Sequence, residues 1–142
     1  MFKTKKPSSL IERLRKALLH DGDILFAYLY GSAAYDPNLP TRDIDVAVYL
    51  KPTNIKGYIS KEEAITAFLI SIFHTDKIDL RILNELPLTL QYSILKDGKL
   101  LFSRDDPQRI DFDTSVMIRF LELKPYLDEY RLMVSQRIRG AA

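Results

Sequence analysis

The chain has 142 residues, a formal net charge of +2 and a hydrophobic share of 46%, which is the profile of a globular protein. It contains no cysteine, so disulfides and thiolate metal sites are excluded. No apolar run approaches the roughly 18 residues of a transmembrane helix, and the N-terminus lacks the apolar core of a signal peptide. We therefore expect a cytoplasmic protein without membrane contact, built as one domain over residues 1–142.

The first half of the chain predicts two helices with two strands between them. A Ser-x-x-Glu capping box opens a helix over about Ser9–His20. The continuous apolar run Ile24–Tyr30 predicts a strand that is covered on both faces, and the alternating segment Asp43–Leu50 predicts a half-buried strand. A second capping box at Ser60–Glu63 is followed by a strongly apolar helix over Ala64–Phe73.

The second half continues the alternation of strands and helices. Ile78–Leu83 alternates as a strand, Pro87 suits the first position of a short helix, and Leu100–Phe102 forms a last short strand. A C-terminal helical segment spans about 106–139, and Pro125 is expected to kink or split it. The order of elements predicts an α+β (mixed α/β) fold, with a small mixed sheet and flanking helices.

Three acidic residues occupy strand positions that place them on one face. Asp43 and Asp45 are two residues apart, so their side chains point the same way at a separation of roughly 7 Å. Asp79 has the same alternation on the next strand and would join them if that strand pairs beside theirs. Carboxylate oxygens arranged in this way favour Mg²⁺, and two such ions would support phosphoryl transfer.

A Gly-Ser pair follows the first buried strand, at Gly31 and Ser32. Glycine permits a close approach of the backbone to a phosphate, and exposed N–H groups with the serine hydroxyl can bind anionic oxygens. Alone, such a pair is usually a turn, and a lone Asp-x-Asp is usually a solvated strand edge. The joint pattern, a phosphate cradle beside a metal site, indicates a nucleoside triphosphate substrate.

The pattern Gly-Ser-x10-Asp-x-Asp, followed by the third acid on another strand, resembles the nucleotidyltransferase superfamily related to DNA polymerase beta. The resemblance covers nearly the whole chain, whose small size is similar to that of the minimal nucleotidyltransferases (MNT). The stretch IDLRILNELPLTLQYSILKDGKLLF resembles the third-carboxylate strand with the helix and strand that follow it. The end, FLELKPYLDEY, resembles the tail of MNT antitoxins that are paired with HEPN-domain toxins.

The resemblance implies a nucleotidyltransferase fold and a role for each matching residue. Asp43 and Asp45 match the metal-binding pair. Asp79 matches the third acid, which helps to hold the catalytic Mg²⁺ and accepts the proton of the attacking hydroxyl. Gly31 and Ser32 match the loop on the triphosphate. The family further implies AMP transfer from ATP to a tyrosine of a HEPN RNase toxin, which silences that toxin in a hetero-oligomeric complex, and the short chain disfavours a nucleic-acid substrate.

The chain departs from the family pattern at one position. Tyr35 stands where the family often has an arginine three residues after the serine, so one positive contact to phosphate is missing. Arg42 or Arg81 is a candidate substitute, although a surface or ion-pairing role is the simpler interpretation of either residue.

Three alternative functions stay open at the level of sequence. The protein could be a non-catalytic antitoxin that neutralises its toxin by direct binding through the apolar C-terminal helix. It could be a nucleotidyltransferase that acts on a small molecule. It could also be an inactive relative that keeps only the fold.

Overall fold

The computed structural model describes residues 9–35 and 43–140, which form a four-stranded mixed sheet with the order β3-β2-β1-β4. Its centre is antiparallel, because β1 pairs antiparallel with both β2 and β4, whereas β3 joins the edge parallel to β2. The strands are β1 (Ile24–Tyr30), β2 (Ile44–Leu50), β3 (Ile78–Ile82) and β4 (Lys99–Ser103). The predicted α+β fold with a small mixed sheet is confirmed.

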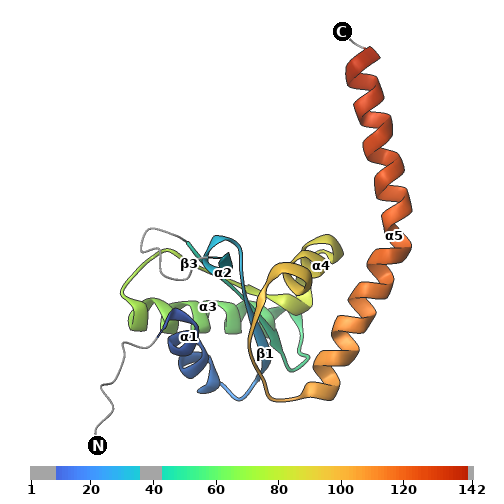
Figure 1. Ribbon diagram of the computed structural model, residues 1–142. Helices are drawn as coiled ribbons and strands as arrows, with labels where there is room; N and C mark the ends of the chain where they lie inside the picture. The colour runs from blue at the N-terminus through green and yellow to red at the C-terminus, as the bar shows by residue number, and fades with distance from the viewer. Residues whose placement is uncertain (1–8, 36–42, 141–142) are drawn as a thin grey trace, which may run out of the picture.

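Helices cover both faces of this sheet (Figure 1). Residues of α1 and α3 pack against one face, which we call the first face, and residues of α4 and of the start of α5 pack against the second face. The helices are α1 (Leu10–Leu19), the short α2 (Ser32–Tyr35), α3 (Ile55–Phe73), α4 (Leu88–Asp97) and α5 (Asp106–Gly140), with a 3-10 turn η1 (Leu83–Glu85) after β3.

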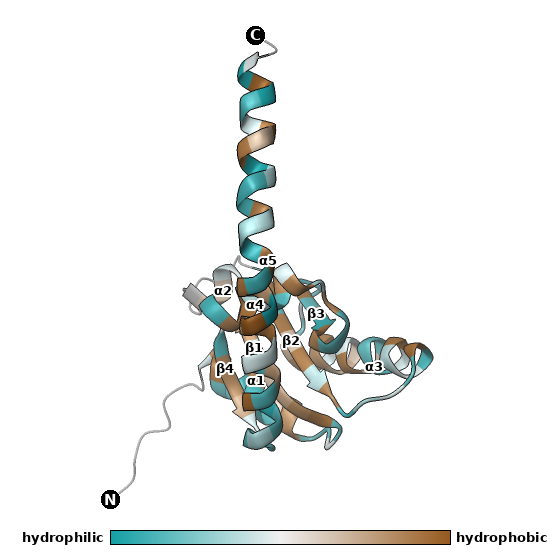
Figure 2. Ribbon diagram, turned by 90° about the vertical axis from the view of Figure 1, so that its right-hand side faces the viewer, coloured by the Kyte–Doolittle hydropathy of each residue, from teal (hydrophilic) through white to brown (hydrophobic). Residues whose placement is uncertain are grey.

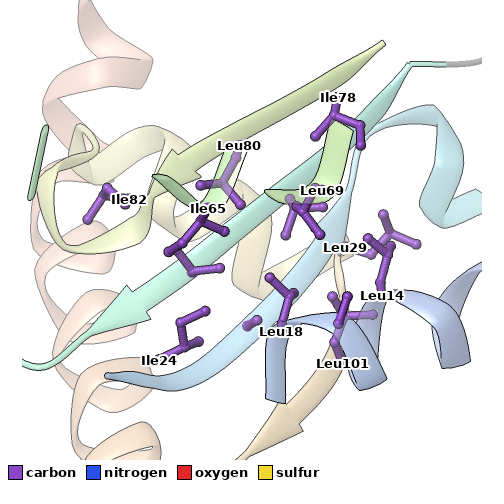
Figure 3. Close-up of a cluster of buried hydrophobic side chains, with 14 of the residues drawn as sticks. Leu14, Leu18, Ile24, Leu29, Ile65, Leu69, Ile78, Leu80, Ile82 and Leu101 are labelled. Atoms are coloured by element: carbon purple, nitrogen blue, oxygen red, sulfur yellow. The ribbon is translucent and has the colours of Figure 1, made fainter. Parts of the chain in front are cut away.

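The first face carries the main hydrophobic core (Figure 3). Ile78, Leu80 and Ile82 alternate toward it from β3, as the period of two predicts. The register of β1 shifts between Ile24 and Phe26, so that both Ile24 and Leu29 reach this core although their spacing is odd. Burial of these aliphatic side chains is the main force that holds α1 and α3 on the sheet.

The second face is aromatic where α5 crosses it. Phe26 of β1 stacks on Tyr49 of β2 with ring centroids 4.4 Å apart, and Phe112 of α5 lies 4.9 Å from Tyr49. Tyr28 donates a hydrogen bond from its Oη to the carboxylate of Asp113, at 3.1 Å to Oδ2. These contacts bury the second face near the end of β2. They do not involve the side chains at the beginning of β2.

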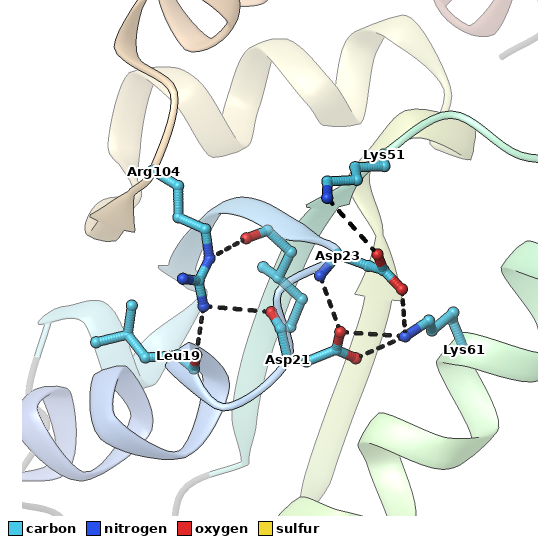
Figure 4. A network of polar contacts seen from close by, with 7 residues as sticks. Leu19, Asp21, Asp23, Lys51, Lys61 and Arg104 are labelled. Atoms are coloured by element: carbon cyan, nitrogen blue, oxygen red, sulfur yellow. Dashed lines mark hydrogen bonds and ion pairs between the residues drawn. The ribbon is translucent and has the colours of Figure 1, made fainter.

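A polar network joins the turn before β1 to its neighbours (Figure 4). The Arg104 guanidinium donates to the carbonyl oxygens of Leu19 and Ile24. Lys61 of α3 forms ion pairs with Asp21 at 3.0 Å and with Asp23 at 2.8 Å. The hydrogen bond from Lys61 is the main reason that the pKa of Asp23 is lowered. The network ties the turn before β1 to α3 and to the end of β4.

The structure corrects the expected start of one helix and excludes a split in another. The helix expected from Ser60 begins at Ile55, because the Asn54 side chain accepts a hydrogen bond from the Gly57 N–H at 2.8 Å and caps an earlier first turn. Of the kink or split expected at Pro125, the split does not occur, since α5 runs through it as one helix. Pro125 is exposed, so water can satisfy the carbonyl that loses its N–H partner.

The C-terminal part of α5 extends well beyond the sheet and its covering helices (Figures 1 and 2). Across the described residues, none of the helices combines the length and the apolar character that a membrane span requires.

Candidate functional site

The strand register places residues of three strands in one row on the second face. Asp45 of β2 is the Cα partner of both Tyr30 on β1 and Asp79 on β3. Directly paired residues point to the same side of a sheet, so the three side chains are neighbours. The pairing of the third predicted strand beside the second is therefore confirmed. Asp43 lies immediately before β2 and is exposed, and its charge acts on Asp45.

Gly31 forms the wall of the site next to Asp45. Its φ is +68°, a left-handed conformation that residues with a Cβ rarely adopt. A Cβ at this position would lie 2.3 Å from Oδ2 of Asp45, a distance that no carbon–oxygen contact tolerates. Ser32 follows at the start of α2 and is partly buried. The sequence predicted the Gly-Ser pair as a site, and the structure places Gly31 directly against one predicted metal-binding carboxylate.

The electrostatics of the row oppose further negative charge. Burial raises the pKa of Asp45, and the carboxylates of Asp79 and Asp43 raise it further. Burial, followed by the charges of Asp79 and Asp45, raises the pKa of Tyr30 to about 12. A cation bound among these oxygens would remove the repulsion between the carboxylates.

Arg81 balances part of this charge. Its Nε lies 3.4 Å from Oδ2 of Asp79, and the two side chains are 48% and 49% exposed. The negative charge of Asp79 is the main reason that the pKa of Arg81 is raised. An ion pair this exposed contributes little to stability, so a ligand phosphate can compete for Arg81 at small cost.

The donor chemistry fits a hard divalent cation, because Asp43, Asp45 and Asp79 supply only carboxylate oxygens. When bound, such a cation would be held by these residues and would polarise a phosphoryl oxygen. Within residues 9–35 and 43–140, however, no three acidic or histidine side chains are arranged as a ready ligand group. Asp79 turns instead to Arg81. The metal-binding roles of the three aspartates stay predictions.

Part of the predicted site lies outside the described residues. Arg42, one candidate for the missing phosphate contact, falls in the segment 36–42 between the two described ranges. Tyr35 is the last residue of α2, and its backbone alone is described.

Tyr30 is a member of the row that the sequence patterns do not predict. The residue ends the apolar run that predicts β1, and that run indicates no further role for it. Its alternation with Phe26 and Tyr28 predicts only that the three side chains share the second face. That Tyr30 lies beside Asp45 follows from the register between β1 and β2, which the sequence does not reveal.

Solved structures with a similar fold come from toxin–antitoxin complexes. A toxin–antitoxin crystal structure with AMP-PNP has a chain with 19% identity and a TM-score of 0.69, and the match covers 91% of this chain and 98% of that chain. A chain of the MntA–HepT toxin–antitoxin has 19% identity and a TM-score of 0.64, with 90% and 96% covered. A chain of the tri-AMPylated Shewanella oneidensis HEPN toxin in complex with MNT antitoxin has 19% identity and a TM-score of 0.64. The match covers 90% of this chain and 95% of that chain. At such identities the likeness establishes the fold.

A family model matches the sequence more directly. The model describes the nucleotidyltransferases of the polymerase beta type and matches residues 12–107. This range includes Gly31, Ser32 and the three aspartates of the site. No curated protein matches the chain. Because the model spans well over half of the sequence and the strands that carry its acidic residues pair side by side, this protein belongs to the polymerase beta nucleotidyltransferase family.

Proposed function

We propose that this protein is a Mg²⁺-dependent nucleotidyltransferase that transfers AMP from ATP to a tyrosine of a HEPN-domain toxin and thereby acts as its antitoxin. The observation that carries the proposal is the row of Asp45 and Asp79 on adjacent strands, with Gly31 against Asp45. Two of the similar solved structures support the setting, since one holds AMP-PNP and another contains a tri-AMPylated HEPN toxin.

Each part of the site has a task in this reaction. The backbone around Gly31 and the Ser32 hydroxyl bind the triphosphate. Asp43 and Asp45 would hold the cation, which would supply positive charge at the α-phosphate. The acceptor hydroxyl oxygen bonds to the α-phosphorus as the bond from that phosphorus to the bridging oxygen breaks. Asp79 accepts the hydroxyl proton, and pyrophosphate leaves with the bridging oxygen.

Intact-mass spectrometry of the HEPN partner tests the proposal. After incubation with this protein, ATP and Mg²⁺, the partner is expected to gain the mass of one or more AMP units, and peptide mapping is expected to place them on tyrosine. Chelation of the metal with EDTA should abolish the gain, because carboxylates alone cannot bring the triphosphate among three negative charges. A stable complex with an unmodified partner under the complete conditions would overturn AMP transfer as the mechanism.

Neutralisation by contact alone is a second candidate function, and α5 is the observation that favours it. Apolar residues recur at spacings of three and four along the helix. The first of them meet the domain, because Val116 is buried and Phe120 stacks on Tyr92 with ring centroids 3.7 Å apart. The pattern continues beyond the domain (Figure 2), where Tyr130 is 64% and Ile138 is 70% exposed. We call the exposed residues Tyr130, Val134 and Ile138 the distal stripe, and we propose that this stripe contacts the HEPN partner.

Replacement of Tyr130 and Ile138 by aspartate should separate binding from chemistry. The double variant is expected to keep its melting temperature, because both side chains are exposed, and to bind the HEPN partner roughly tenfold more weakly or worse. Isothermal titration calorimetry measures the affinity. Gln136→Asp, at an exposed polar position of the same helix, is the matched control and should bind normally. Unchanged affinity in the double variant would contradict a role for the stripe.

A further inference from the structure

A hollow lies along the outer side of β3, next to the proposed catalytic row. It has a volume of about 440 Å³ and is walled by the first turns of α3, by β3 and by η1. The strand β3 is at the edge of the sheet, where it pairs with β2 alone. The β3 wall of the hollow includes Asp79 and Arg81. Any group that occupies it therefore meets the carboxylate that accepts the proton in the proposed reaction.

The α3 wall of the hollow is apolar and uncovered. Ile55 is 71% exposed and Ile59 is 51% exposed, and both line the hollow together with Tyr58. Large aliphatic side chains that are exposed at the wall of a concave site are characteristic of ligand-binding surfaces. The volume lies within the range of pockets that enclose ligands somewhat larger than one aromatic side chain.

The rim of the hollow is acidic. Glu62 of α3 and Glu85 of η1 line it together with Asp79, and Arg81 is the one cation among the lining residues that the structure describes. That cation is already paired with Asp79. No salt bridge between described residues involves either glutamate. Three carboxylates against one paired guanidinium therefore make the rim attract a cationic ligand.

We propose that this hollow is the acceptor pocket, and that it takes a peptide segment in which the acceptor tyrosine is flanked by basic residues. The inference rests on the proposed function, and it adds which kind of residue flanks the acceptor tyrosine in the substrate. The phenol ring would lie against Ile55 and Ile59, with its hydroxyl toward Asp79 and the α-phosphate. The basic neighbours would meet Glu62 and Glu85, which makes these two glutamates specificity-determining residues.

Two short fluorescent peptides test the pocket without relying on catalysis. Both contain one central tyrosine, which is flanked by arginines in one peptide and by glutamates in the other. Fluorescence anisotropy in the presence of AMP-PNP and Mg²⁺ is expected to show binding of the arginine peptide to the full-length protein and little binding of the glutamate peptide. In the Glu62→Arg, Glu85→Arg double variant, the arginine peptide should bind roughly tenfold more weakly, because two attractive rim charges become repulsive.

Glu63→Arg is the matched control, because Glu63 is exposed on the same helix but does not line the hollow. It should leave the affinity for the arginine peptide unchanged, and all three proteins should share one melting temperature and one affinity for AMP-PNP. Equal binding of the two peptides, or equal weakening by Glu63→Arg, would overturn the acceptor pocket. Failure of AMP transfer itself is a separate result, read from the mass of the HEPN partner while peptide binding persists.

Discussion

The Asp45→Asn variant is expected to lose AMP transfer by roughly a thousandfold or more, since several kcal/mol of charge stabilisation at the transferring phosphate would be lost. Asp45 is the central member of the row, with Tyr30 and Asp79 as its partners on the two sides. Asparagine keeps the shape of the side chain but removes the charge that would hold the cation in the proposed reaction. Initial rates of AMP incorporation into the HEPN partner measure the loss, and the Asp43→Asn, Asp45→Asn double variant should show no incorporation.

The same substitution is expected to raise the melting temperature at neutral pH by about one or two degrees. Burial and the charges of Asp79 and Asp43 raise the pKa of Asp45 in the folded state, so the ionised carboxylate destabilises the fold. The advantage of asparagine should fade as the pH falls through that raised pKa, and it should be gone below the ordinary value of 3.8. The expected gain is small because the side chain is only partly buried.

Scanning calorimetry of the wild type and Asp45→Asn across this pH interval is the measurement. Asp111→Asn is the control, because Asp111 is exposed on α5 and should change neither the rate nor the melting temperature. A melting temperature of Asp45→Asn well below that of the wild type at neutral pH would show that the carboxylate stabilises the fold. In that event the loss of activity would not identify a catalytic role.

Local patterns were sufficient to predict most of the fold. The alternation of Ile78, Leu80 and Ile82 correctly predicted both a strand and its buried face. The start of α3 was misplaced because the Ser60 capping box competes with the Asn54 cap, and only packing decides between two plausible first turns. The continuity of α5 through Pro125 depends on solvent exposure, which periodicity does not report.

The candidate site was predictable where its members lie close together in the sequence. Gly31, Ser32, Asp43 and Asp45 form a spaced motif, and Asp79 followed from alternation on a second strand. The contact of Gly31 with the Asp45 carboxylate could not be predicted, because it depends on how β1 and β2 pair. The same holds for the hollow beside β3, because its walls form only when the first turns of α3 pack beside β3 and η1.

Gly31→Ala is expected to lower the free energy of unfolding by about 1–3 kcal/mol, the sum of a left-handed backbone penalty and of overpacking. The new methyl group would lie 2.3 Å from Oδ2 of Asp45, so that the carboxylate or the turn must move. A displacement of about 1 Å at a reacting centre costs about a hundredfold in rate. Urea unfolding measures the stability, and initial rates of AMP incorporation measure the activity.

Gly22→Ala separates the loss of a glycine from the collision with Asp45. A Cβ at Gly22 would meet nothing within 4 Å, so this variant should stay within about 0.5 kcal/mol of the wild type and keep its activity. Gly31→Ala should also lose affinity for AMP-PNP, because the proposed reaction places the triphosphate against this backbone and carboxylate. If Gly31→Ala bound AMP-PNP and transferred AMP as well as Gly22→Ala does, the wall between Gly31 and Asp45 would have no part in the reaction.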